Sequence, residues 1–145
     1  MSGIIVGIDG SHNAHHALEW AMKEAAIRNA PLTVLTVHEV AASYWTGNPI
    51  TLPADEPARE KARQAAEDAV AKAASELGGS RPASVTVRAI TGFAAGELIT
   101  AAGDADLIVV GSRGGGGFAK LLVGSVSSQV VHHAKCPVVV VPEKR

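Results

Sequence analysis

Cysteine and aromatic residues are scarce in this sequence of 145 residues, which has one cysteine and 3% aromatic residues. A lone Cys136 excludes an internal disulfide framework and a zinc site built from several cysteines. We therefore expect a reducing, cytoplasmic setting for the protein. The thiol of Cys136 is expected to fill space in the core, with redox sensing as the alternative.

Surplus charge and long hydrophobic runs are also missing. Thirteen Lys and Arg residues against fourteen Asp and Glu residues leave a formal net charge of -1, so the chain lacks the cationic surplus that binds nucleic acid or anionic lipid. The residues from Met1 to Ile4 have no basic flank, and no run approaches the roughly 18 apolar residues that span a bilayer. We expect a soluble protein that is not exported and that binds neither nucleic acid nor membranes.

Short apolar runs are present instead, and they predict buried strands. Four of them are rich in β-branched residues and lack polar alternation, as strands covered on both faces do; they are residues 4–8, 32–37, 107–110 and 138–141. A fifth run, 84–90, alternates more and contains Arg88, which predicts a strand nearer an edge. Apolar residues at helical spacing predict helices between the strands, at about 12–29 with Ser11 as N-cap, 57–77, 94–102 and 124–134.

This alternation of strands and helices indicates one α/β domain over residues 1–145. The expected fold is a parallel sheet of about five strands with helices on both faces, which is a Rossmann-like architecture. Such sheets bind ligands beyond the carboxyl ends of their strands, where the strand order reverses. The positions of interest therefore follow Ile8, Val37 and Val110. The linker 39–54 lacks periodicity, and its length predicts a flap or an interaction loop.

A glycine-rich segment begins where the fourth strand is predicted to end. Five of the seven residues from Gly111 to Gly117 are glycine, which allows successive backbone N–H groups to turn towards one anion at the start of a helix. This pattern predicts a bound phosphate, with a flexible loop as the alternative. The segment is not a Walker A loop, and Gly7 and Gly10 are not followed by the third glycine of a dinucleotide fingerprint.

Asp9 follows the first strand, at the same predicted edge of the sheet. A carboxylate there could accept hydrogen bonds from ribose hydroxyls or help to hold a divalent ion near phosphates. The alternative is a loop aspartate that caps the first helix.

The spacing Gly111-x2-Gly114-x9-Gly124-Ser125 resembles the phosphate-binding pattern of the ATP-binding branch of the universal stress protein family. The similarity extends over essentially the whole chain, including the segments 6–11, 35–38, 105–114 and 136–142. It implies an open, five-stranded sheet of strand order 3-2-1-4-5 that binds ATP, in a homodimer paired through the last strand.

The resemblance also implies roles for individual residues. Gly7 and Asp9 would lie against the nucleoside, with Asp9 near the ribose or a Mg or Mn ion, and Val37 would contact adenine through its backbone. The backbone after Gly111 would cradle the phosphates, and the two cations of the loop would offset their charge, unless these cations are only exposed surface residues. The full expected nucleotide-binding set is Gly7, Asp9, Val37, Gly111, Ser112, Arg113, Gly114, Gly115, Gly116, Gly117, Lys120, Gly124 and Ser125.

No group in the sequence is recognisable as the base for phosphoryl transfer. We therefore expect a nucleotide-dependent regulatory switch in a stress response, without catalytic residues. Slow ATP hydrolysis or phosphotransfer is one alternative, and a dimeric interaction protein that binds AMP or a cyclic nucleotide is another. The apolar strand at 138–141 would be an aggregation-prone edge if unpaired, and pairing of two copies through it would cover that edge.

Histidines form two groups on predicted helices. His15 and His16 follow His12 at the i+3 and i+4 positions, a spacing that can place metal ligands on one helix face. His132 and His133 form the second group. We identify no suitably spaced carboxylate or cysteine for either group, so polar helix surface is the expectation and structural zinc the alternative.

Overall fold

The computed structural model describes residues 3–9, 12–39, 56–79, 81–112 and 125–142. Strands and helices alternate along these ranges, as predicted. The elements are β1 (Ile4–Ile8), α1 (His12–Arg28), β2 (Pro31–Glu39), α2 (Glu56–Leu77), β3 (Ser84–Gly92), α3 (Ala94–Ala101), β4 (Leu107–Gly111), α4 (Ser125–His133) and β5 (Val138–Val141).

The five strands form one sheet in the order β3-β2-β1-β4-β5. All four neighbouring pairs are parallel, so the predicted Rossmann-like α/β fold is confirmed. The most extended ladder joins β2 to β3, from Pro31 opposite Ser84 to Glu39 opposite Gly92. The edge position predicted for β3 is also confirmed, and Arg88 is exposed there.

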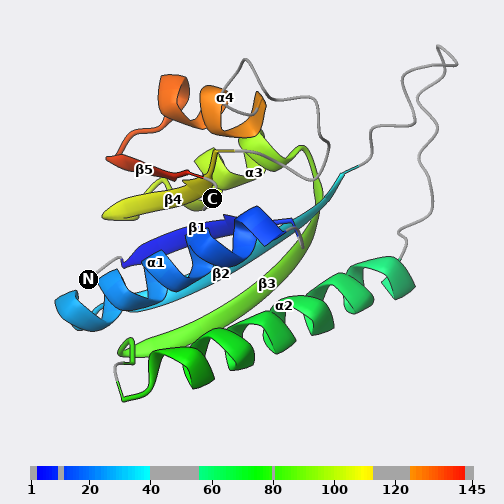
Figure 1. The fold of residues 1–145 in the computed structure, drawn as a ribbon. Helices are drawn as coiled ribbons and strands as arrows, with labels where there is room; N and C mark the ends of the chain where they lie inside the picture. Colours follow the sequence, from blue (N-terminus) through cyan, green and yellow to red (C-terminus); the bar gives the residue numbers. More distant parts are fainter. Residues whose placement is uncertain (1–2, 10–11, 40–55, 80, 113–124, 143–145) are drawn as a thin grey trace, which may run out of the picture.

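Two hydrophobic cores cover the two faces of the sheet, with α1 and α2 on one face and α3 and α4 on the other (Figure 1). Side chains on a strand alternate between faces, so Ile4 and Val6 pack with α1 and α2 whereas Ile5 packs with α3 and α4. Small alanines dominate the inner side of α1, which brings this helix close to the strands. Among the described residues, no helix has the length and apolar character needed to cross a membrane.

Most element boundaries agree with the sequence to within two residues. The helix α1 ends at Arg28 because Asn29 adopts a left-handed conformation with φ of 52°, a conformation that terminates helices. Gly78, with φ of 71°, does the same after α2. Ser11, the expected N-cap of α1, lies outside the described residues.

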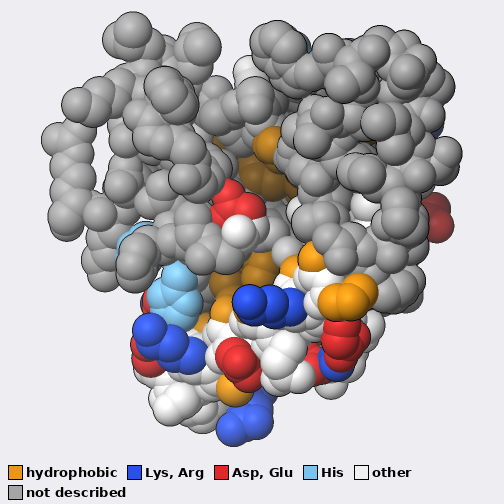
Figure 2. Space-filling view, turned by 90° about the vertical axis from the view of Figure 1, so that its right-hand side faces the viewer, with side chains coloured by type: hydrophobic (Ala, Val, Ile, Leu, Met, Phe, Trp, Pro, Cys, Tyr) orange, Lys and Arg blue, Asp and Glu red, His pale blue; other side chains and the backbone are white. Residues whose placement is uncertain are grey.

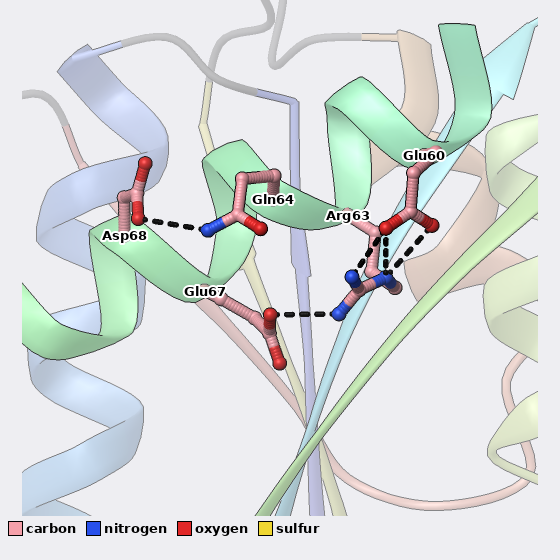
Figure 3. Close-up of polar contacts among 5 residues, drawn as sticks. All are labelled: Glu60, Arg63, Gln64, Glu67 and Asp68. Carbon is pink, nitrogen blue, oxygen red and sulfur yellow. Dashed lines mark hydrogen bonds and ion pairs between the residues drawn. The ribbon is translucent and has the colours of Figure 1, made fainter. Parts of the chain in front are cut away.

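The outer surface of α2 carries a chain of ion pairs (Figure 3). Arg63 donates hydrogen bonds to Glu60, one turn before it, and to Glu67 at 2.7 Å, one turn after it. Gln64 donates to Asp68 at 3.2 Å. Hydrogen bonds from Arg63 lower the pKa of Glu60. Since these contacts are spaced at i+3 and i+4, they stabilise the helix locally.

Candidate functional site

The strand order reverses between β1 and β4, and this point defines the candidate site. The chain leaves β1 towards α1 on one face of the sheet, whereas α4, the helix after β4, lies on the opposite face. In sheets of this class, adjacent parallel strands whose following helices lie on opposite faces bound the crevice that binds ligands, and here that crevice is expected beyond the carboxyl ends of β1 and β4.

Asp9 and Ser112 lie at equivalent levels of these two strands. Val6 pairs with Val109, and Asp9 and Ser112 each come three residues after that pair. Asp9 is exposed and Ser112 is half-buried. Figure 2 views the molecule from the carboxyl ends of the strands, the side on which both residues follow their strands. The fold thus places at the same edge of the sheet two residues that the sequence separates by about a hundred positions.

The backbone of Gly111 and Ser112 continues the sheet. Gly111 pairs with Val141 of β5, and the Ser112 N–H donates a 2.9 Å hydrogen bond to the Val141 carbonyl. This N–H is therefore already engaged within the sheet. The side-chain hydroxyl is therefore the donor that Ser112 has left to offer a ligand.

Val37 lies on β2 next to the crevice, opposite Ile90 of β3. It is half-buried and packs against the core beneath α3 and α4. Ile8, the last residue of β1, pairs with Thr36, so Val37 extends one position past the end of β1. Its position suits a backbone contact at the rim of the crevice.

Gly7 has a packing role that the sequence did not reveal. A Cβ at this position would lie 2.9 Å from both terminal methyl carbons of Leu98. Leu98 belongs to α3 and is buried, so the absence of a side chain at Gly7 lets α3 pack closely on β1. The described contacts of Gly7 therefore face the core and α3.

The remaining residues of the expected phosphate loop lie outside the described residues. Ser125 begins α4, and its side chain is outside them as well. The residues of the expected phosphate loop that lie wholly outside the described residues are Arg113, Gly114, Gly115, Gly116, Gly117, Lys120 and Gly124.

At the amino end of the sheet, two hydrogen bonds join Gly3 to Asp106. The Gly3 N–H donates to the Asp106 carboxylate at 3.0 Å, and the Asp106 N–H donates to the Gly3 carbonyl at 2.8 Å. Gly3 has a φ of 87°, a conformation that favours glycine. Asp106 thus has a structural role, at the end of the sheet opposite to Asp9.

Sequence analysis failed to find carboxylate partners for the histidines on α1, and the structure corrects this. His15 Nε2 lies 3.0 Å from a carboxylate oxygen of Glu19 and 3.3 Å from one of Glu76. Glu19 has the i+4 spacing that could have revealed it, whereas Glu76 comes from α2 and needed the fold. His132 and His133 are exposed at the end of α4, as expected of polar helix surface.

Cys136 precedes β5 and packs against the core beneath α3 and α4. The sequence had suggested a buried thiol, whereas in the structure Cys136 is half-buried. Burial raises the pKa of its thiol, and the nearby negative charge of Asp106 raises it further. A raised pKa disfavours the reactive thiolate, which fits a space-filling role better than redox sensing.

Comparison with known proteins assigns the family. Residues 1–142 match the sequence profile of the universal stress protein family. A universal stress protein of Mycobacterium tuberculosis is 36% identical over 143 residues, which cover 96% of this chain and 47% of the relative. The chain thus spans about half the length of the curated relatives that it matches.

Solved structures agree with this assignment. The universal stress protein UspA from Lactobacillus plantarum has a TM-score of 0.73 and 27% identity, with 97% of each chain covered. A universal stress protein in complex with cAMP has a TM-score of 0.67 and 26% identity, covering 99% of this chain and 98% of that one. By sequence and by fold, the chain belongs to the universal stress protein family.

Proposed function

We propose that this protein binds ATP in the crevice above β1 and β4 and acts as a nucleotide-dependent regulatory switch. The observation that carries the proposal is the placement of Asp9 level with Ser112 at the reversal of strand order, where sheets of this class bind nucleotides. The complex of a similar universal stress protein with cAMP supports a nucleotide as the ligand class. The lone cysteine fits action in the reducing cytoplasm.

In this proposal each rim residue has a distinct role. Asp9 accepts hydrogen bonds from the ribose or helps to hold a Mg or Mn ion beside the phosphates, and the Val37 backbone contacts adenine. Gly7 supports the site from below by allowing α3 to pack on β1. A metal ion here would neutralise phosphate charge, and an exposed carboxylate such as Asp9 is a suitable oxygen ligand for it.

The phosphates are assigned to the segment that follows β4. Since the Ser112 N–H is bonded to Val141, Ser112 would contribute its hydroxyl, and backbone N–H groups would come from the residues after it. The glycines 111, 114–117 and 124 would allow close approach of the backbone. Ser125 at the start of α4, together with Arg113 and Lys120, would complete the anion site.

A homodimer paired through β5 is the second part of the proposal. The Val141 carbonyl points to β4, because it accepts from Ser112. Neighbouring residues of a strand direct their backbone groups to opposite sides, so the N–H and carbonyl of Val140 face the free edge. A second copy could pair with these groups and cover the apolar edge.

Two alternatives remain distinct from a switch that binds ATP. AMP or a cyclic nucleotide could be the ligand, and the cAMP complex of a similar protein favours testing this. Slow ATP hydrolysis would make the protein an enzyme; in that case Asp9→Asn would abolish turnover while binding persists.

The test is calorimetric titration of the full chain with ATP, AMP and cAMP in the presence of Mg²⁺. Asp9→Asn should weaken ATP binding about 10- to 100-fold, because a hydrogen bond to a charged group contributes about 1.5–3 kcal/mol. Asp104→Asn is a matched control, since Asp104 is exposed beside the amino end of β4, and it should bind ATP normally. Absence of ATP binding by the wild type, or equal effects of both substitutions, would overturn the proposal.

A further inference from the structure

A cluster of three potential metal ligands lies between α1 and α2. His15 and Glu19 are one turn apart on α1, and Glu76 belongs to the last turn of α2. One ligand atom from each residue lies within 4.8 Å of the other two, and no other such group of three occurs among the described residues. Nucleotide binding, as proposed above, makes no use of these side chains.

The distances within the cluster suit a small dication. Ligand atoms about 2.0–2.2 Å from a tetrahedral zinc ion lie about 3.3–3.6 Å from one another. The observed separations from His15 Nε2 are 3.0 Å to Glu19 and 3.3 Å to Glu76. The ligand atoms of Glu19 and Glu76 lie within 4.8 Å of each other, so adjustments of these flexible side chains would bring all three atoms to the distances of a bound ion.

Packing of α1 and α2 holds the backbone of the cluster in place, while its side chains stay partly exposed to solvent. Ala14, Ala17 and Ala73 are buried in the same core, so the two helices that carry the ligands are fixed by packing. The side chains of His15 and Glu19 are 21% and 25% exposed, and that of Glu76 is 43% exposed. An ion can thus enter from solvent past Glu76 and bind to ligands held by packed helices.

We propose that His15, Glu19 and Glu76 bind a divalent transition metal of the zinc type, with water completing the coordination. Two carboxylates cancel the charge of a dication, and an imidazole nitrogen favours zinc over the oxygen-seeking Mg²⁺ and Ca²⁺. The ion links the first half of α1 to the end of α2. The alternative is that the three side chains only contact one another, as they do in the structure.

The proposal is tested by titrating the full, metal-stripped chain with Zn²⁺ in the absence of nucleotide. We expect one saturable site per chain and a higher thermal unfolding temperature with Zn²⁺, because an ion that binds only the folded state stabilises it. Loss of even an outer-shell partner costs about 10–100-fold in metal affinity. His15→Ala and Glu76→Gln should therefore each weaken Zn²⁺ binding at least about tenfold.

His16→Ala is the matched control, since His16 is the adjacent histidine on α1 and is not part of the cluster. It should bind Zn²⁺ as the wild type does. Glu76→Gln preserves the shape of an exposed side chain, so it separates loss of a ligand from loss of folding, which circular dichroism checks. Wild-type protein without saturable Zn²⁺ binding, or binding that survives His15→Ala but is lost in His132→Ala/His133→Ala, would refute the proposal.

Discussion

The two edges of the sheet differ in length, polarity and exposure. The edge strand β3 is nine residues long and mostly exposed, and it presents Thr86, Arg88 and Thr91 to solvent. The opposite edge strand, β5, consists of four valines, all half-buried. One edge is thus adapted to water by its side chains, whereas the other is short and apolar.

This difference indicates where a second copy can pair. Charged and polar side chains are a common protection of exposed edge strands, and β3 has them. The four residues of β5 that the structure describes include no charged or polar side chain, so their side chains do not oppose pairing. The first prediction below tests whether the β5 edge is the assembling one, and the next three contrast it with other parts of the molecule, in decreasing order of expected effect.

The largest effect is expected for Val140→Pro. Proline lacks the N–H that faces the free edge, while the hydrogen bond from Ser112 to Val141 stays possible. We expect the homodimer to become a monomer, measured by light scattering after size-exclusion chromatography. Val140→Thr keeps the backbone N–H and should stay dimeric. A monomeric wild type at micromolar concentration would remove the basis of this comparison.

The central strand gives the contrasting case, in which stability changes and assembly does not. Gly7→Ala places a methyl group against Leu98, and such overpacking costs about 1–3 kcal/mol. We expect a lower midpoint of urea unfolding, partly restored by Leu98→Val. Gly96→Ala on α3 meets no atom within 4 Å and should instead stabilise by up to about 1 kcal/mol. Equal midpoints for the two glycine variants would contradict the assigned packing role.

Cys136, next to the β5 edge, should react slowly. Burial and the charge of Asp106 raise the pKa of its thiol, so less thiolate is present at neutral pH than for an exposed cysteine. Alkylation by iodoacetamide, followed by mass spectrometry, should be slower in the folded than in the urea-unfolded protein, and should accelerate as the pH rises. Equal rates in both states would show that the thiol is not protected.

The smallest effect is expected for the exposed ion pairs on α2, the helix that packs against β3. Arg63→Ala removes the ion pairs to Glu60 and Glu67 on α2, but exposed pairs contribute little. Thermal unfolding should shift slightly downwards, less than for Gly7→Ala, and the oligomeric state should not change. A similar shift at high salt would argue against an electrostatic origin.

The sequence predicted the fold well because most of its strands are apolar along their whole length. The runs at 4–8 and 138–141 coincide with β1 and β5, since a strand covered on both faces needs apolar residues along its length. The strands β2 and β3 extend further than predicted, to Glu39 and Gly92. Their last residues are polar or glycine, and pairing with the neighbouring strand includes them in the sheet.

The candidate sites were harder to predict from the sequence than the fold was, for two physical reasons. Gly7 was assigned to the ligand by resemblance, and only the packing of Leu98 from a distant helix reveals its structural role. The cluster around His15 depends on Glu76, which lies 61 residues further along the chain. Contacts between elements are set by how helices pack on the sheet, and no local pattern encodes that.

The hydrogen bond from Ser112 to Val141 joins the rim of the crevice to the last residue of the edge strand. At 2.9 Å it tolerates little stretching. A ligand that displaces the backbone of Ser112 must therefore either break this bond or move the end of β5 with it. The rim of the crevice and the outer edge of the sheet are therefore mechanically coupled, so that a movement at one is transmitted to the other.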